Sequence, residues 1–356
     1  MNIKDIARKA NVSITTVSRI LNNDESFSVT NDTRKLVLAI ATEFNYKSKR
    51  KNNIKPKVNI INKENRIKNI GLLLSVTQQE EFNDPYFLSI REGIEKQTAD
   101  LEINISSIIR LNGNNFNVVL DNVDGLIVVG NIASDNLKVI FPQTNNIVFV
   151  DHAPKDGEFD SVISNLGKAT ENILEYLFEL GHQHIGFIGG PKKSKNISGS
   201  VKTVEVEEER RKVYERIMEG RGVLNSKHIF IGDWNSAEGY ELMKKAIDAG
   251  NLPSAFVVAS DPMSIGALRA LNEANIKIPE DVAIISFDDI ETAAYLQPTL
   301  STVKIYTEQM GRMAVKVLAE RFNNRDVPIQ IVIPTKLIVR ESCGGQTNNE
   351  HCNYIL

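Results

Sequence analysis

Residues 3–22 read IKDIARKANVSITTVSRILN, and this stretch decides the fold of the first part of the chain. It opens with apolar residues at the i, i+3, i+4 and i+7 spacing of a short amphipathic helix: Ile3, Ile6, Ala7 and Ala10. Residues 11–13 interrupt this pattern, and Ser13 is a suitable N-cap for a second helix that starts directly after it. Two short helices joined by such a turn predict a helix-turn-helix motif.

The second helix, over residues 14–23, has two different faces. Its inward face consists of Val17, Ile20 and Leu21, and its outward face of Ile14, Thr15, Ser18 and Arg19. A third helix from about residue 30 to residue 44, capped by Thr30, Asn31 or Asp32, packs on the pair through Leu36, Val37, Ile40, Ala41 and Phe44. The small outward side chains suit a DNA major groove, where Arg19 reaches a guanine edge. Ser13, Thr16 and Asn22 are placed to donate to phosphates.

Charge is distributed unevenly along the 356 residues. Residues 1–68 hold 15 Lys and Arg against 6 Asp and Glu, a net charge of +9, whereas the rest of the chain holds 27 against 39, a net charge of −12. A basic head on an acidic body indicates a polyanion as the partner of the head. The simpler alternative is a solvated basic tail, and the helix-turn-helix pattern argues against it.

The head resembles the DNA-binding head of the LacI/GalR family of transcriptional regulators. The resemblance is carried by A-x-x-A-x-V-S-x-x-T-V-S-R-x-L-N over residues 7–22, followed by VTNDTRKLV and FNY. It implies that Ile14, Thr15 and Arg19 read bases, and that the DNA backbone is contacted by Ser13, Thr16, Asn22 and Thr30. The turn NNDESFSV is slightly longer than the family norm.

Residues 47–57, KSKRKNNIKPK, have the composition of a linker, with six cations, one proline and no acid. Family members usually continue into a short hinge helix whose leucine wedges into the DNA minor groove. No leucine occurs here between Tyr46 and Leu72. We therefore expect phosphate contacts in place of a leucine wedge, from Lys47, Lys49, Arg50 and Lys51.

From residue 68 onward the pattern changes to alternating strands and helices. Apolar runs predict strands at 70–75, 125–130, 147–150, 184–188, 255–259 and 282–287, and amphipathic stretches predict helices at 86–100, 167–181, 207–220, 238–250 and 264–275. Apolar strands separated by helices indicate doubly wound parallel sheets, and the length of the body indicates two lobes.

The predicted fold is α/β, with a helix-turn-helix head and two doubly wound parallel-sheet lobes of periplasmic-binding-protein type. The expected divisions are a head over 1–46, a linker over 47–68, a first lobe over 69–163 and 295–322, a second lobe over 164–294 and 323–343, and a tail over 344–356.

Polar residues follow the predicted strands, where doubly wound sheets bind their ligands. Asp151, Ser260-Asp261 and Asp288-Asp289 each come directly after an apolar run, although aspartate is also a common turn former. Together with Arg210 and the only tryptophan, Trp234, they fit a site for a polyol, since hydroxyls pair with carboxylate and guanidinium groups and a sugar ring stacks on an indole.

The body also resembles the LacI/GalR family, through LGHQHIGFIGGP, ASDPMSIGALRAL and IPEDVAIISFDD. The resemblance places effector contacts at Asp151, Arg210, Trp234, Ser260 and Asp288, with Phe82, Asn83 and Tyr86 at the cleft side of the first lobe. Ser260 stands where an asparagine is common, and the neighbouring Arg211 is an alternative to Arg210. The GDW sequence around Trp234 resembles that of the galactoside-responsive family members, which implies galactose or a galactoside as effector; the alternative is that Trp234 only covers the edge of the sheet.

Other classes of protein fit the sequence less well. An enzyme is not expected, because the chain has no nucleophile elbow, no P-loop and no G-x-G-x-x-G after residues 70–75. A metal site or other cofactor is not expected, and Cys343 and Cys352 do not form a disulfide framework. An exported sugar receptor needs a signal peptide, and a membrane protein needs a long apolar span, so neither class is expected for this sequence.

The sequence thus predicts a cytoplasmic, dimeric, DNA-binding repressor of a sugar-utilisation operon. Its expected partners are double-stranded operator DNA, a small sugar effector and a second copy of the chain. The alternative is a relative that answers to another sugar or to a phosphoprotein corepressor. The tail GGQTNNEHCNYIL lacks the leucine heptads of a tetramerising coiled coil.

Overall fold

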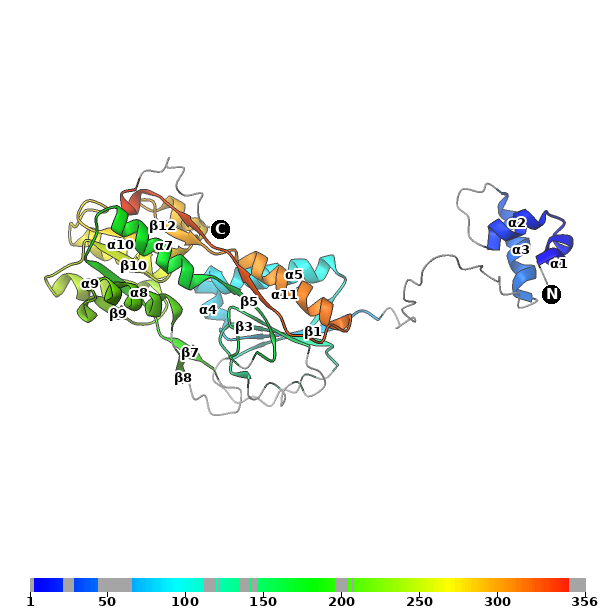
Figure 1. Ribbon diagram of the computed structural model, residues 1–356, viewed down its shortest axis with the longest axis horizontal. Helices are drawn as coiled ribbons and strands as arrows, with labels where there is room; N and C mark the ends of the chain where they lie inside the picture. Colours follow the sequence, from blue (N-terminus) through cyan, green and yellow to red (C-terminus); the bar gives the residue numbers. More distant parts are fainter. Residues whose placement is uncertain are drawn as a thin grey trace. The chain divides into compact units, whose positions relative to one another are not determined.

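A computed structural model describes residues 3–21, 29–43, 66–111, 120, 122–134, 137, 141, 146–155, 157–195, 204–206 and 208–345. The chain divides into two compact units, residues 1–65 and residues 66–356 (Figure 1). In its described part, no helix combines the length and the apolar character needed to cross a membrane.

The first unit is built from α1 (Ile3–Lys9), α2 (Ile14–Leu21) and α3 (Asn31–Glu43). Asn11 takes the left-handed conformation in the turn between α1 and α2, with φ 54°. The three helices share one apolar core, made of Ile6, Ala7, Ala10, Val17, Ile20, Val37, Ile40 and Ala41. The predicted helix-turn-helix is confirmed.

One residue of the predicted third-helix face is placed differently. Leu36 is 49% exposed, whereas Val37, Ile40 and Ala41 are buried. Successive helical residues point about 100° apart, so only residues at the spacing of 37, 40 and 41 share the inner side. The expected contribution of Phe44 lies outside the described residues.

The second unit contains two six-stranded sheets in its described part. The first has the order β13-β5-β4-β3-β1-β2, and all of its strand pairs are parallel. Its strands are β1 (Asn69–Leu74), β2 (Asn104–Arg110), β3 (Gly125–Val129), β4 (Ile147–Val150), β5 (Asp160–Ser164) and β13 (Gln330–Ile333).

The second sheet has the order β14-β12-β11-β10-β6-β9, and only its β12–β14 pair is antiparallel. Its strands are β6 (Ile185–Gly189), β9 (Ile229–Ile231), β10 (Ala255–Val258), β11 (Ala283–Asp288), β12 (Ser301–Lys304) and β14 (Lys336–Ile338). A separate hairpin pairs β7 (Lys192–Ser194) with β8 (Val204–Val206). The expected α/β class with two largely parallel sheets is confirmed.

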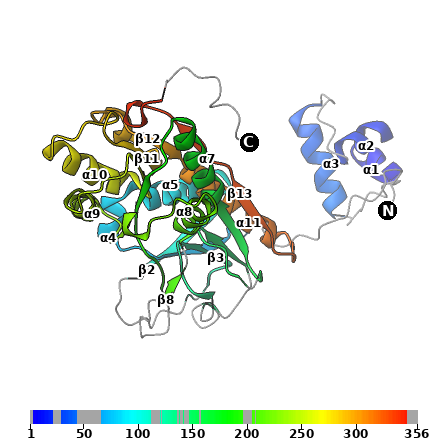
Figure 2. The same ribbon diagram turned by 60° about the vertical axis from the view of Figure 1, so that its left-hand side comes forward.

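Helices cover these sheets, as Figure 2 shows. They are α4 (Gln78–Asn83), α5 (Pro85–Asp100), α7 (Leu166–Glu179), α8 (Glu209–Gly220), α9 (Ser236–Asp248), α10 (Asp261–Glu273) and α11 (Thr307–Phe322), with short 3-10 turns at Ser226–His228, Glu291–Tyr295 and Glu341–Cys343. Helices α5 and α11 pack closely, because a Cβ atom added at Gly93 would lie only 2.1 Å from the Glu308 carbonyl oxygen.

Two of the three crossings between the lobes lie at places that differ from the expected divisions. β12, expected in the first lobe, lies in the second sheet, and β13, expected in the second lobe, lies in the first sheet. The crossings therefore fall at residues 164–166, 304–307 and 333–336. Both strands are short, and their apolar pattern does not show which sheet supplies the hydrogen-bonding partner.

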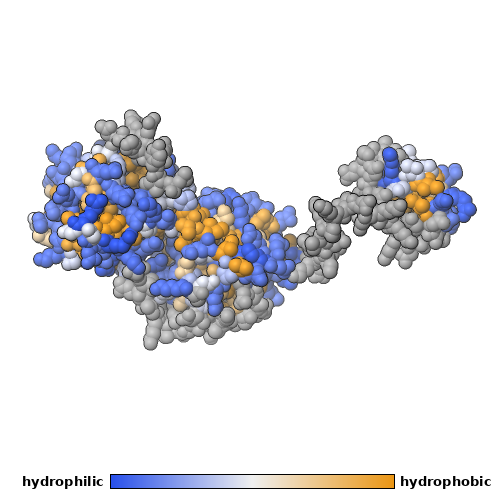
Figure 3. Space-filling model, viewed as in Figure 1, coloured by the Kyte–Doolittle hydropathy of each residue, from blue (hydrophilic) through white to orange (hydrophobic). Residues whose placement is uncertain are grey.

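The interior of the second unit is apolar and continuous. One cluster joins residues from both sheets, including Ile70, Val129, Phe187 and Phe287, while separate clusters cover the far side of each sheet. On the face seen in Figure 3, hydrophilic residues predominate, and apolar residues gather near the middle of this unit.

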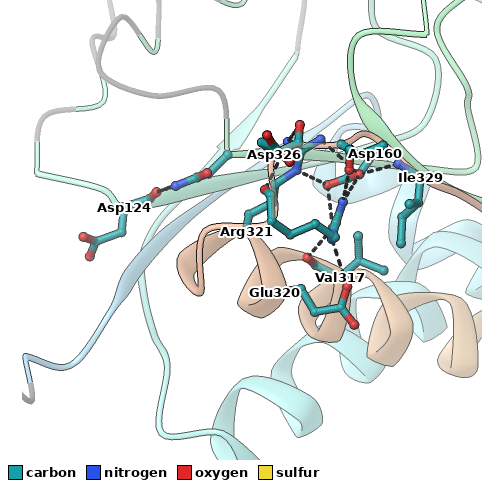
Figure 4. A network of polar contacts seen from close by, with 10 residues as sticks. Asp124, Asp160, Val317, Glu320, Arg321, Asp326 and Ile329 are labelled. Carbon is teal, nitrogen blue, oxygen red and sulfur yellow. Dashed lines mark hydrogen bonds and ion pairs between the residues drawn. The ribbon is translucent and has the colours of Figure 1, made fainter. Parts of the chain in front are cut away.

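A buried ion cluster fastens α11 to the first sheet (Figure 4). Asp160, at the start of β5, is 0% exposed and accepts from Arg321 Nε at 2.6 Å and from Arg325 Nη1 and Nη2 at 2.8 and 2.9 Å. The amide of Ile329 also donates to its carboxylate at 2.7 Å. This cluster joins β5 to the segment that leads from α11 into β13.

Candidate functional site

The first-lobe part of the candidate site is formed by Tyr86 and Asp151. Asp84 caps helix α5 by accepting from the Tyr86 amide at 3.0 Å, and Pro85 occupies the first helical position. This local structure places Tyr86 so that its hydroxyl donates to Asp151 Oδ1 at 2.7 Å. Asp151 directly follows β4 in a left-handed turn, with φ 67°. The expected residues Tyr86 and Asp151 are therefore brought together.

The second lobe contributes Arg210, near the start of α8. Glu208 caps this helix through Oε2, which accepts from the Arg211 amide at 3.0 Å, while its Oε1 accepts from Arg210 Nε at 2.7 Å. Arg210 Nη1 donates to the carbonyl oxygen of Ala259 at 2.6 Å. Within the described part of the chain these bonds leave Nη2 available for a ligand.

Trp234 supports this guanidinium. The Arg210 guanidinium carbon lies 4.8 Å from the centre of the indole and 5.4 Å from the ring centre of Phe287. The indole N–H donates to the Pro191 carbonyl oxygen at 3.0 Å, and a Cβ atom at Gly190 would lie 2.4 Å from the ring. Trp234 therefore positions Arg210, which the sequence did not predict.

Asp288 and Asp261 lie at the ends of neighbouring strands of the second sheet. The Asp261 amide donates to Asp288 Oδ2 at 3.3 Å, and Asp288 has an unusual φ of 113°. Asp261 accepts from Thr302 Oγ1 at 2.7 Å and from the Ile290 amide at 3.0 Å. Ser260 caps α10 by accepting from the Met263 amide at 3.4 Å, so its described role is structural.

The carboxyl groups of both lobes interact electrostatically with the same guanidinium, that of Arg210. Burial raises the pKa of Asp288 well above its ordinary value, and Asp261 and Asp84 raise it further, while Arg210 opposes them. Burial likewise raises the pKa of Asp151, against the opposing charges of Lys192 and Arg210. Burial also raises the pKa of Asp84, again opposed by Arg210.

We define the cleft cluster as Asp84, Tyr86, Asp151, Arg210 and Asp288. It offers several acceptors, a phenol and a guanidinium, which is the chemistry that binds hydroxyl groups. In the described residues, no three His, Cys, Asp or Glu side chains are arranged to hold a metal ion.

Four expected residues lie outside the cleft cluster: Trp234 and Ser260, whose contacts are given above, and Phe82 and Asn83. Phe82 is 81% exposed on α4, and the exposed Asn83 accepts from Gln79 Nε2 at 3.1 Å. Arg211, the alternative to Arg210, pairs with Glu215 at 2.8 Å, and both of these side chains are more than a third exposed.

Several contributing residues were missed by sequence reasoning. They are Asp84, Lys192, Glu208 and Phe287. A signal existed for Asp84, because an aspartate before a proline is a favourable helix start, but nothing in the pattern linked Glu208 to Arg210.

In the first unit, α2 presents the expected surface. Ile14, Thr15 and Arg19 are exposed, while Val17 and Ile20 are buried beneath them. Ser13 Oγ caps the helix by accepting from the Thr16 amide at 3.0 Å.

Thr30 caps the next helix by accepting from the Thr33 amide at 3.4 Å. The remaining expected DNA contacts lie outside the described residues: Asn22, Lys47, Lys49, Arg50 and Lys51.

Each of the two units of the chain matches a known protein family. Residues 2–49 match the family of bacterial regulatory proteins, lacI family, and residues 174–343 match the periplasmic binding protein-like domain.

Related proteins match along nearly the whole chain. The HTH-type transcriptional repressor MelR of Bacillus subtilis (strain 168) is 41% identical over 344 residues, which cover 97% of this chain and 98% of that protein. The HTH-type transcriptional regulator GalR of Lacticaseibacillus casei is 36% identical over 345 residues, covering 96% and 98%.

Solved structures share the fold at lower identity. The complex of the transcriptional regulator CelR with cellobiose has a TM-score of 0.65 at 23% identity, covering 96% of this chain and 99% of that one. The lac repressor dimer bound to operator and the anti-inducer ONPF has a TM-score of 0.64 at 23% identity, covering 96% and 98%. With its helix-turn-helix unit and its two-lobed body, the chain belongs to the lacI family of bacterial transcriptional regulators and is not an enzyme.

Proposed function

We propose that this regulator represses a sugar-utilisation operon and leaves its operator when a small sugar, galactose or a galactoside, binds between the lobes. The observation that carries the proposal is the cleft cluster, in which Tyr86 and Asp151 of the first lobe lie in the field of Arg210 and Asp288 of the second. Sugar hydroxyls donate to carboxylates and accept from a guanidinium, so one sugar satisfies both lobes at once.

The relatives support the general chemistry. CelR was solved with cellobiose, and the lac repressor was solved with operator DNA and with ONPG. The preference for galactose rests on the resemblance around Trp234. Since the Trp234 N–H is already bonded to Pro191, any ligand contact by this residue involves the ring and not the N–H group.

Release from DNA follows from differential affinity. A ligand that contacts both lobes stabilises the arrangement in which those contacts are complete, and it changes operator affinity only if that arrangement fits the operator less well. The effect is reciprocal, so operator DNA weakens sugar binding by the same factor, with a coupling of about 1–3 kcal/mol.

The regulator is proposed to act as a homodimer. A helix-turn-helix unit reads one half-site, and a palindromic operator requires two units related by a two-fold axis. Ile108, on the edge strand β2 of the first sheet, is an exposed apolar side chain of the first lobe. We place the contact beside the first-lobe helix α5.

The test is operator binding by the full chain with and without galactose, lactose or cellobiose, measured by fluorescence anisotropy on a palindromic operator selected from a random pool. Wild type should release the operator with at least one of these sugars. Arg210→Ala and Asp288→Ala should bind the operator and no longer release it, because each substitution leaves ligand hydroxyls without partners.

Arg211→Ala is the matched control, since Arg211 is the neighbouring arginine and pairs outside the cleft cluster. It should respond to sugar as wild type does. An unchanged response in Arg210→Ala would remove Arg210 from the site. A wild type that answers to none of the sugars would contradict the release model and favour the phosphoprotein alternative.

A further inference from the structure

Asn131 is a buried side chain without hydrogen bonds. It follows β3, it is 9% exposed, and neither its Nδ2 nor its Oδ1 has a partner in the described part of the chain. Buried amide groups are nearly always hydrogen-bonded in folded proteins, because an unsatisfied donor or acceptor loses its bonds to water. This amide therefore destabilises the ligand-free protein.

Asn131 lies at the edge of the first sheet that carries the cleft cluster. β3 and β4 are parallel and in register, with Val129 opposite Val150, so Asn131 and Asp151 both follow the carboxyl ends of neighbouring strands. The amide of Gly130 donates to the Val150 carbonyl oxygen at 2.9 Å. A second unpaired buried group, Ser164 Oγ, ends the next strand, β5, so the carboxyl ends of β3 and β5 each carry a buried polar side chain without a partner among the described residues.

The second lobe reaches the first lobe at this residue. The β7 strand of the hairpin continues to Lys195, whose amide donates to the Asn131 carbonyl oxygen at 3.1 Å. The Ala133 amide donates to the Lys195 carbonyl oxygen at 3.0 Å, and Lys195 Nζ donates to the Leu111 carbonyl oxygen at 3.4 Å. Lys192 of the same strand acts electrostatically on Asp151. Asn131 thus lies at a contact between the lobes.

We propose that Asn131 is a specificity-determining residue that binds a hydroxyl group of the ligand, donating through Nδ2 and accepting through Oδ1. A hydroxyl both donates and accepts, and so it satisfies both ends of the amide. A phosphate or carboxylate on the ligand satisfies only the donor and leaves the Asn131 Oδ1 acceptor without a partner. The ligand class is therefore a neutral polyhydroxyl compound. This inference rests on the proposed sugar-binding function.

The proposal predicts that one substitution strengthens the fold and weakens ligand binding. Asn131→Leu has a similar shape and removes the unpaired amide, so the ligand-free full chain should unfold at a higher urea midpoint than wild type. Its dissociation constant for galactose, lactose or cellobiose, whichever wild type binds in calorimetry, should rise about tenfold or more, as the loss of two hydrogen bonds requires. Asn131→Asp retains the acceptor and loses the donor, so it should also weaken binding.

Asn146→Leu is the matched control. Asn146 precedes β4 at the opposite end of the same sheet, and its Nδ2 donates to the Asp124 carbonyl oxygen at 3.1 Å. This variant should lower the urea midpoint and leave the dissociation constant unchanged. Operator binding without sugar confirms that each variant is folded.

The outcomes separate the two proposals. Unchanged sugar binding in both Asn131 variants would overturn the role of Asn131, while the sugar-binding function would stand. The same conclusion would follow if Asn131→Leu lowered the urea midpoint and Asn131→Asp bound sugar as wild type does. Binding of galactose 6-phosphate in preference to galactose would overturn the neutral ligand class. A wild type that binds none of the sugars would overturn the proposed function and this inference with it.

Discussion

At the scale of single residues, Asp160 and the cleft carboxylates show how partners decide the charge of a buried group. Although burial opposes it, hydrogen bonds from Arg325 and Arg321 lower the pKa of Asp160. Asp261 has hydroxyl and amide partners among the described residues, and burial raises its pKa to about 7. A cationic partner thus favours the charged form of a buried carboxyl group, whereas burial with neutral partners favours the protonated form.

Asp160→Asn should therefore be strongly destabilising. The substitution leaves the buried Arg321 without its counter-ion and removes one of the two carboxylates that pair with Arg325, which costs about 3–5 kcal/mol of unfolding free energy. Urea unfolding of the ligand-free chain measures this loss. Glu320→Gln is the matched control, because Glu320 pairs with the same Arg325 at 2.9 Å but is largely exposed. The Glu320→Gln substitution should lower the free energy of unfolding by no more than about 1 kcal/mol.

The difference in unfolding free energy between Asp160→Asn and wild type should depend on pH, because the pKa of Asp160 is lowered in the folded protein. A carboxylate whose folded pKa is depressed contributes its stability above its unfolded pKa of about 3.9 and loses it as the pH falls through the folded value. The difference in unfolding free energy between the two proteins should therefore be constant near neutral pH and shrink in acid. A gap that persisted undiminished in acid would show that the charge of Asp160 is not its source.

At the scale of elements, α2 combines a buried side with an exposed side that carries Ile14, Thr15 and Arg19. Its position is secured locally, by the Ser13 cap and by Val17 and Ile20 in the core. The exposed side thus keeps a fixed geometry relative to α1 and α3, which is what reading a DNA groove requires.

Arg19→Ala should relax base preference at one position of each half-site. The loss of a bidentate guanine contact costs about 1–3 kcal/mol against the preferred base and little against the others. Competition binding on operators that vary at single positions measures this pattern. Arg8→Ala, in the exposed Arg8–Asp5 pair of α1, should leave base preference unchanged. Equal weakening on all sequences would make Arg19 a phosphate contact instead.

At the scale of the whole molecule, the proposed function needs a second copy. Light scattering of the full chain at micromolar concentration should give the mass of a dimer, and adding operator should give one dimer per palindrome. A stable tetramer would contradict the expectation drawn from the tail, and a monomer that binds a full palindrome with one copy would contradict the dimer itself.

The sequence by itself determined the elements whose signals are local. The helices of the first unit begin and end close to the predicted residues, because caps such as Ser13 and the spacing of Ile6, Ala7 and Ala10 act within a few residues. Fully apolar runs such as 125–129 were predicted as buried strands for the same reason. The family resemblance also predicted one ligand site from Tyr86, Asp151, Arg210 and Asp288, whose side chains interact in the structure, while their role in ligand binding stays a prediction.

Only the tertiary structure decided what depends on residues far apart in the chain. The sheets that take β12 and β13, the choice of Arg210 over Arg211, and the support of Arg210 by Trp234 were set in this way. So was the burial of Asn131 beside Lys195. Short strands and single polar residues have nearly equivalent local alternatives, and the contacts that distinguish those alternatives form only when the two lobes pack.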